Sequence, residues 1–195
     1  MPSLASCSGC SRTVAALALC ACQLCHAGAV GETAPAPAAL AEINIALNHR
    51  IVFADDATNW GRADYWATPE ELHARGAGDC EDLAIAKYFA LRAVGLPAKQ
   101  LRLVYAQLLR GGVGDLWGPH MVLAYLPEDA VAGDELILDN VLDEIRPLSR
   151  RPDLRILISF DTDGVWLALE RGPPAREARQ IAPWVSVLQR MTPRP

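Results

Sequence analysis

One cysteine stands among acidic residues: Cys80 lies between Asp79 and Glu81, with Asp82 next in the chain. This segment is expected at the start of a helix, where unpaired backbone N–H groups and the helix macrodipole favour a thiolate, the nucleophilic form of cysteine. Neighbouring carboxylates oppose the thiolate by like-charge repulsion. Such a cysteine is therefore either inert or accompanied by a cation.

Two further residues can complete a nucleophilic site with Cys80. His120 opens one β-rich run, and Asp139 lies in the next run along the chain. If these strands are neighbours in a sheet, both side chains lie side by side on one face. A thiol, an imidazole and an orienting carboxylate, in this chain order, are the catalytic set of a papain-type enzyme.

Each of these residues also has ordinary roles open to it. A cysteine at a helix start is often a small buried residue, a strand histidine is often only hydrogen-bonded, and an aspartate after a strand often caps a turn. Cys80, His120 and Asp139 would also suit zinc in a non-catalytic metal- or peptide-binding module, although three ligands make an incomplete tetrahedral site. The residue types alone leave these alternatives open.

Helices are predicted before and at the cysteine. Residues 38–53 begin with apolar side chains spaced for one face of a helix. Thr68 and Glu71 form a capping box around Pro69, which opens a short helix over the following residues. From residue 79 to about residue 94, apolar residues recur at steps of three and four, which predicts a buried helix with Cys80 in its first turn.

The second half of the chain changes to short β-rich runs separated by turn-rich segments. The Asp163-Gly164 pair indicates a hairpin between the last two runs. Helices followed by strands predict an α+β fold, with an antiparallel sheet packed on the cysteine-bearing helix. The predicted strands cover residues 101–109, 120–126, 135–141, 154–160 and 165–169.

The length, composition and charge of the chain indicate its class and exclude two kinds of partner. The chain has 195 residues, of which 51% are hydrophobic and 21% charged, as expected for one globular domain. Its formal net charge is −5 and its 18 Lys and Arg residues are scattered. We therefore expect neither nucleic acid nor an anionic membrane surface as a partner.

The first 25 residues contain five of the six cysteines. An apolar run too short to span a bilayer ends in the small residues Ala27, Gly28 and Ala29, which is typical of a signal peptide. We expect a signal peptide over residues 1–29, a Pro/Ala linker over 30–38 and one domain over 39–195. The mature protein would be exported, without a transmembrane segment, and would contain the single cysteine Cys80.

Two alternatives remain for this leader. The CSGC stretch of Cys7 and Cys10 is half of a zinc or redox motif, but no second pair follows to complete it. The sequence around Cys20 and Cys22 resembles a lipobox, so a lipid anchor at Cys22 is the second alternative.

Several separate motifs carry a family resemblance. They are NWGRADYWATPEE, GAGDCEDLAIAKYFALRAVGLP, HMVLAYL, LILDNV and RRPDLRILISFDTDGVWL. In this order they resemble the bacterial transglutaminase-like cysteine proteinases, the family of the LapG-type periplasmic proteases. The resemblance extends from about Ile45 to Leu167.

The resemblance implies a papain- and transglutaminase-like core with Cys80 as nucleophile, His120 as acid–base and Asp139 as orienting residue. It also implies a periplasmic endopeptidase that cleaves a large surface adhesin near the adhesin's N-terminus and so releases cells from a biofilm. A membrane-bound receptor that sequesters the protease is expected as its regulator. The same triad performs acyl transfer to amines in transglutaminases, and these residues do not distinguish water from an amine as acceptor.

The resemblance further implies calcium, with Asp79 and Glu81 as ligands and Asp82 as a weaker candidate. Flexible sets of oxygen ligands suit Ca²⁺, and a divalent ion would offset the repulsion between the carboxylates and the thiolate. The alternative is that Asp79 caps the helix while the other two acids complement its dipole.

Overall fold

The structure is a computed structural model that describes residues 36–111 and 116–192. The predicted signal peptide and the lipid anchor at Cys22 lie outside these residues. Within them, no helix is both long enough and apolar enough to cross a membrane.

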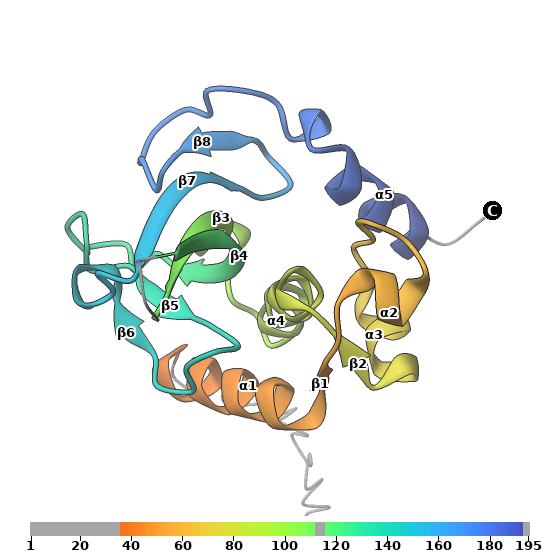
Figure 1. Cartoon of the computed structure of the whole chain (residues 1–195). Coiled ribbons are helices and arrows are strands. Elements are labelled where there is room, and N and C mark those ends of the chain that lie inside the picture. Colours follow the sequence, from red (N-terminus) through yellow and green to blue (C-terminus); the bar gives the residue numbers. More distant parts are fainter. Residues whose placement is uncertain (1–35, 112–115, 193–195) are drawn as a thin grey trace, which may run out of the picture. The chain divides into compact units, whose positions relative to one another are not determined.

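Five α-helices and eight strands make up the described chain, together with three short 3₁₀ turns (Figure 1). The helices are α1 (Ala36–Arg50), α2 (Asp56–Trp60), α3 (Pro69–Arg75), α4 (Cys80–Ala93) and α5 (Ala182–Met191). The strands are β1 (Val52–Phe53), β2 (Ala77–Gly78), β3 (Leu101–Arg110), β4 (Leu116–Tyr125), β5 (Leu136–Leu138), β6 (Arg146–Pro147), β7 (Leu154–Phe160) and β8 (Val165–Leu167).

Six strands form one antiparallel sheet in the order β6-β5-β4-β3-β7-β8. The central strand β3 is covered on both faces, since alternate residues belong to different apolar clusters: Leu101 and Leu103 to one, Val104 and Ala106 to the other. The predicted α+β class with an antiparallel sheet is confirmed. The hairpin at Asp163-Gly164 is confirmed too, because it joins β7 to β8.

Helix α4 lies in the middle of the fold, between the sheet and helix α1 (Figure 1). It packs against β4 on one side and against α1 and α3 on the others. Its buried residues therefore surround most of its circumference instead of forming one stripe: Asp82, Leu83, Ala84, Ile85, Ala86, Lys87, Tyr88 and Leu91.

Capping residues fix the segment that enters α4. The capping box of α3 is present: Glu71 N–H donates to Thr68 Oγ1 at 3.2 Å, and Thr68 N–H donates to Glu71 Oε2 at 2.8 Å. Gly76 ends α3 with φ at 68°, a left-handed conformation that favours glycine. The side chain of Asp79 then caps α4 by accepting from the N–H of Asp82. The start of α4 is thus set within four residues of the end of α3.

A short parallel pair of strands lies beside this turn. Residues Val52 and Phe53 of β1 pair with Ala77 and Gly78 of β2. The backbone N–H of Ala54 continues the pairing by donating to the carbonyl of Gly78 at 3.0 Å. This pairing brings the segment before α2 next to the first turn of α4, which the sequence patterns did not predict.

The C-terminal helix α5 was not predicted either. Its Trp184 is fully buried in the main core, and the indole N–H donates to the carbonyl of Asp161 at 3.0 Å. Arg190, the penultimate residue of α5, donates to the carbonyl of Trp66. The last helix therefore joins the sheet to the segment that precedes α3.

Candidate active site

Cys80 is the first residue of α4, and its half-buried thiol is free. The thiol donates a hydrogen bond to Glu81 Oε2 over 2.8 Å and faces the backbone N–H of Met121. Met121 follows His120 on β4, the strand against which α4 packs. The structure therefore brings the cysteine to the part of β4 that carries the histidine.

The surroundings of Cys80 keep it protonated. Burial raises the pKa of the thiol above its ordinary value, and the charge of Glu81 and its hydrogen bond raise it further. The backbone N–H of Met121 acts in the opposite direction but is outweighed. A thiolate here needs additional positive charge or a proton acceptor close by.

His120 and Asp139 lie in contact. His120 Nε2 and Asp139 Oδ1 are 2.8 Å apart, and both side chains are buried. Strands β4 and β5 pair directly, with Leu123 opposite Leu138, and Asp139 follows the end of β5. The predicted neighbouring strands are thus present. Because Nε2 is engaged by the carboxylate, Nδ1 is the ring nitrogen that is left to exchange a proton.

The carboxylate of Asp139 has two further partners. Its Oδ1 also accepts from the N–H of Val141 at 3.1 Å, and its Oδ2 accepts from Arg151 Nη2 at 2.7 Å. Burial by itself raises the pKa of Asp139, but the hydrogen bonds from His120 and Arg151 outweigh it and hold the pKa at about 2. Asp139 is therefore an anion throughout the physiological range.

A separate group of acids lies at the start of α4. Asp56, Asp79 and Asp82 each place one carboxylate oxygen within 4.8 Å of the other two. Asp56 Oδ2 accepts from the N–H of Tyr65 at 2.6 Å, and Asp82 Oδ1 accepts from the N–H of Ala67 at 2.6 Å. Their remaining oxygens, Asp56 Oδ1 and Asp82 Oδ2, are buried and have no hydrogen-bond partner among the described residues.

The negative charge of each of these acids is disfavoured by burial and by the neighbouring carboxylates. Burial, followed by repulsion from Glu81 and Asp82, raises the pKa of Asp79 to about 8. Burial is also the main reason that the pKa of Asp82 is raised to about 7, and the pKa of Asp56 is raised in the same direction. Buried carboxylates without a compensating cation are costly, so the group is suited to a bound cation.

The donor set and the backbone both fit calcium. Carboxylate oxygens from two segments form a flexible oxygen-only set of the kind that Ca²⁺ prefers. Gly78 allows the close approach, because a Cβ at this position would lie 2.5 Å from Leu72 Cδ1 and 2.7 Å from Asp82 Oδ2. A side chain at residue 78 would therefore displace Asp82 from the group.

Sequence reasoning found some of these residues and missed others. Of the predicted metal ligands, Asp79 and the weaker candidate Asp82 belong to the acidic group, whereas Glu81 hydrogen-bonds the thiol. The role of Glu81 as a ligand stays a prediction. Asp56 was missed; its signal is the Asp55-Asp56 pair, in which Asp55 alone caps α2 through the N–H of Thr58.

Arg151 and Tyr105 were also missed. Arg151 reaches Asp139 from the turn after β6, and no local pattern indicates that contact. Tyr105 lies on β3 opposite Met121, and burial and the nearby charge of Glu81 raise its pKa to about 12. Its hydroxyl therefore belongs to the surroundings of the thiol.

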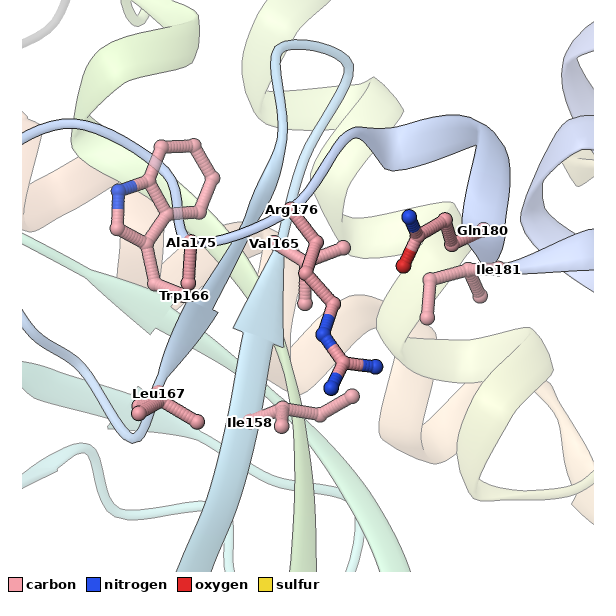
Figure 2. A pocket seen from close by; sticks show the side chains of 8 residues that line it. All are labelled: Ile158, Val165, Trp166, Leu167, Ala175, Arg176, Gln180 and Ile181. Atoms are coloured by element: carbon pink, nitrogen blue, oxygen red, sulfur yellow. The ribbon is translucent and has the colours of Figure 1, made fainter.

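A cavity of about 250 Å³ lies further along the same face of the sheet. Ile158 of β7, which lines it, pairs with Tyr105, and both pack on the core cluster that Cys80 contacts. Figure 2 shows the side chain of Arg176 extending along the cavity toward Ile158. The cavity thus offers a mostly apolar recess two strands away from β4. Its other lining residues are Val165, Trp166, Leu167, Ala175, Gln180 and Ile181.

Three tryptophans near the segments of the site, Trp60, Trp66 and Trp117, differ in position. Trp66 is buried in the core, where its ring lies 5.8 Å from that of Phe160. Trp117 and Trp60 are partly exposed, and each carries an arginine over its ring. Trp66 is therefore a core residue.

Comparisons with known proteins agree on one family. The family model described as bacterial transglutaminase-like cysteine proteinase matches residues 10–172. Calcium-bound LapG of Legionella pneumophila is 37% identical, with 81% of each chain covered and a TM-score of 0.69. EGTA-treated LapG of the same organism has the same identity and TM-score, with 81% of this chain and 80% of that chain covered. A comparison with curated proteins finds no match.

Proposed function

This chain belongs to the bacterial transglutaminase-like cysteine proteinases, and from that premise we propose that it is a calcium-dependent cysteine endopeptidase. Cys80 is the nucleophile, His120 the acid–base and Asp139 the carboxylate that orients the imidazole. The observation that carries the proposal is the 2.8 Å contact of His120 Nε2 with Asp139, next to the strand position that faces the Cys80 thiol.

The first half of the reaction forms a thioester. The proton of Cys80 passes to His120 Nδ1, and the sulfur bonds to the carbonyl carbon of the scissile peptide. The imidazolium then gives its proton to the amine as the C–N bond breaks. Asp139, which is anionic at neutral pH, stabilises the imidazolium and keeps Nε2 as the nitrogen that faces it.

The second half restores the thiol. Water attacks the thioester carbon while His120 takes its proton, and the C–S bond breaks to release a carboxylic acid. The proton then returns from the imidazolium to the sulfur.

We assign the acidic group at the start of α4 to calcium. Asp56, Asp79 and Asp82 would hold the ion, and Glu81 remains a further candidate ligand. When bound, the ion supplies positive charge that offsets the carboxylates around Cys80 and fixes the turn before α4. The unpartnered oxygens of Asp56 and Asp82 support this assignment, as does the existence of calcium-bound and EGTA-treated structures of LapG.

The substrate and location follow from family membership and from the leader. We propose that the protein is exported to the periplasm after removal of residues 1–29, or is lipid-anchored there at Cys22. Its substrate is a large surface adhesin, cleaved near the N-terminus, and this cleavage disperses biofilm. Its regulator is a membrane-bound receptor that sequesters the protease.

The test is mass spectrometry of an N-terminal fragment of a large surface adhesin from the same bacterium after incubation with the protein. We expect one new pair of peptides with wild type, and none with Cys80→Ser or after addition of EGTA. Cleavage by Cys80→Ser would reject the nucleophile, and absence of cleavage by wild type would reject the substrate class. A primary amine in the same incubation distinguishes acyl transfer, because a transferase leaves the amine attached to the new carboxyl end.

A further inference from the structure

Arg151 contacts Asp139 on the side opposite the histidine. The guanidinium Nη2 lies 2.7 Å from Asp139 Oδ2, while His120 Nε2 lies 2.8 Å from Oδ1. The side chains of Arg151 and Asp139 are 2% and 0% exposed, so water does not compete for this contact. The carboxylate is therefore held from both of its oxygens.

Arg151 is itself fixed in place. Its Nε donates to Asp153 Oδ1 at 3.0 Å, and its Nη2 donates to Asp153 Oδ2 at 2.8 Å. Its backbone N–H donates to Leu148, and its carbonyl accepts from Leu154, the first residue of β7. A planar guanidinium clamped in this way presents one N–H direction to Asp139, unlike a flexible ammonium.

The other buried cation near Asp139 is a weaker permanent charge. Lys87 of α4 is buried, and burial lowers its pKa to about 7 against the opposing charges of Asp139 and Asp143. A guanidinium stays protonated at any physiological pH. Arg151 is thus the cation that faces Asp139 at every pH at which the protein works.

A purely stabilising role does not account for this arrangement. Buried ion pairs recover little more than their desolvation cost, and apolar replacements of similar size are often as stable. Orientation of the carboxylate does account for it, because a donor at Oδ2 adds to the Val141 N–H at Oδ1 in opposing rotation of the carboxylate away from His120.

We propose that Arg151 is a positioning residue for peptide cleavage, which holds Asp139 so that Oδ1 stays directed at His120 Nε2 and leaves Nδ1 for proton transfer. The proposal rests on the proposed catalytic roles of Cys80, His120 and Asp139. Asp153 supports it by holding the guanidinium.

The test is a double-mutant cycle on cleavage of the adhesin fragment, with Arg151→Met, Asp139→Asn and the double variant. We expect Arg151→Met to lower kcat roughly tenfold or more, with KM changed less than about twofold, because it acts on orientation and not on substrate binding. In the Asp139→Asn background, Arg151→Met should lower kcat by less than about threefold, since the two residues act as one unit. Equal losses in both backgrounds would overturn the proposal.

Two further variants and one control guard against a folding artefact. Arg151→Lys keeps a donor and should recover part of kcat, and Asp153→Asn should lower kcat severalfold while the side chain of Arg151 is retained. Arg146→Met removes a partly exposed arginine whose Nε and Nη2 both bind Glu144, and it should leave kcat unchanged. If Arg151→Lys matches Arg151→Met, or Arg146→Met matches either, the positioning role is wrong.

A substrate-free measurement separates this proposal from the proposed function. The rate at which iodoacetamide alkylates Cys80 at pH 7, followed by mass spectrometry, reports how well His120 accepts the thiol proton. We expect slower alkylation in Arg151→Met than in wild type. The double variant should be alkylated no more slowly than Asp139→Asn. If wild type cleaves no adhesin fragment but this coupling is present, the substrate is wrong and the positioning role holds. If alkylation is the same in wild type and Arg151→Met, the positioning role is rejected.

Discussion

Asp139 and the acidic group of Asp56, Asp79 and Asp82 lie on different sides of the candidate site, and they differ in how their charge is balanced. Asp139 has its partners within the chain, His120, Val141 and Arg151, and its pKa is held at about 2. Asp79 and Asp82 have mainly other carboxylates near them, and their pKa values are raised to about 8 and about 7. Asp139 is thus compensated within the chain, whereas Asp79 and Asp82 are disfavoured as anions by burial and by neighbouring carboxylates.

This contrast separates two proposed requirements of the site, which are proton transfer and a bound cation. In the proposed mechanism the His120–Asp139 side provides the proton transfer, and its contacts lie within the folded chain. In the proposed function the acidic side adds a dependence on calcium, because burial and the charge of Glu81 disfavour the thiolate of Cys80. The residues proposed for proton transfer and those proposed to bind calcium thus lie on different segments.

Removal of calcium tests the acidic side of the site, and we expect it to have the largest effect. We expect EGTA to lower the turnover of wild type roughly a hundredfold or more, because it removes the charge that offsets the acids beside the nucleophile. The unfolding temperature should fall as well, since a ligand that binds only the folded state adds stability by mass action. Calorimetry and cleavage assays before and after readdition of Ca²⁺ measure both effects, and magnesium should rescue poorly. Unchanged turnover in EGTA would leave the acids as helix caps alone.

Asp139→Asn should give the next largest effect, on the other side of the comparison. We expect kcat to fall by roughly one order of magnitude or more, because an amide can hold the imidazole in the wrong tautomer. Calcium uptake, measured by titration calorimetry, should be unchanged in this variant. Asn140→Ala is the matched control, and the orienting residue is misassigned if Asn140→Ala is damaging while Asp139→Asn is silent.

Asp56→Asn should weaken calcium binding without altering the proton-transfer side. One carboxylate charge fewer should raise the calcium dissociation constant by roughly one order of magnitude. Turnover at saturating calcium should remain within about threefold of wild type, because Asp56 touches no reacting group. Asp55→Asn is the neighbouring control, since Asp55 caps α2 and asparagine caps as well. Equal calcium affinities for the two variants would remove Asp56 from the ligand set.

The smallest expected effect is a dependence of calcium affinity on pH. Without the ion, the pKa values of about 8 for Asp79 and about 7 for Asp82 mean that both carboxyls carry protons at pH 6. Calcium has to displace these protons, so its affinity should rise severalfold per pH unit between pH 6 and pH 8 and level off above that range. Titration calorimetry in two buffers of different ionisation enthalpy measures the protons released. A flat affinity profile would contradict the raised pKa values.

The same shifts fix the sign of a stability change in metal-free protein. The folded state keeps its protons on Asp79 and Asp82 up to a pH at which the unfolded chain has lost them, near its ordinary value of 3.8. The folded state therefore binds more protons than the unfolded state between about pH 4 and pH 8, and stability falls as the pH rises through this window. With calcium bound, this slope should largely disappear.

The sequence predicted those parts of the fold and the site that depend on local pattern. The capping box of Thr68, the helix that begins at Cys80 and the hairpin at Asp163-Gly164 each follow from residues within a few positions of one another. The contact of His120 with Asp139 was expected on the condition that their strands are neighbours, and β4 and β5 do pair, as consecutive strands usually do.

The remaining parts depend on contacts between distant segments. Asp56 joins the acidic group only because β1 pairs with β2, and a two-residue strand has no periodicity to detect. Arg151 reaches Asp139 from a turn whose sequence indicates only an exposed loop. Glu81 was expected as a calcium ligand by resemblance, whereas its side chain here hydrogen-bonds the thiol. Side-chain direction at a helix start is decided by packing and not by sequence order.

The contacts of helix α5 bear on the order in which parts of the fold form during synthesis. Trp184 fills the core beneath the sheet, and Arg190 holds the carbonyl of Trp66, the residue before the segment that leads into α3. During synthesis on the ribosome the chain emerges from its N-terminus, so these contacts form only after Trp184 and Arg190 have been made. Cys80, the proposed nucleophile, is translated before α5, so its surroundings are completed later. A nascent chain therefore carries the thiol before the core that includes Trp184 has formed.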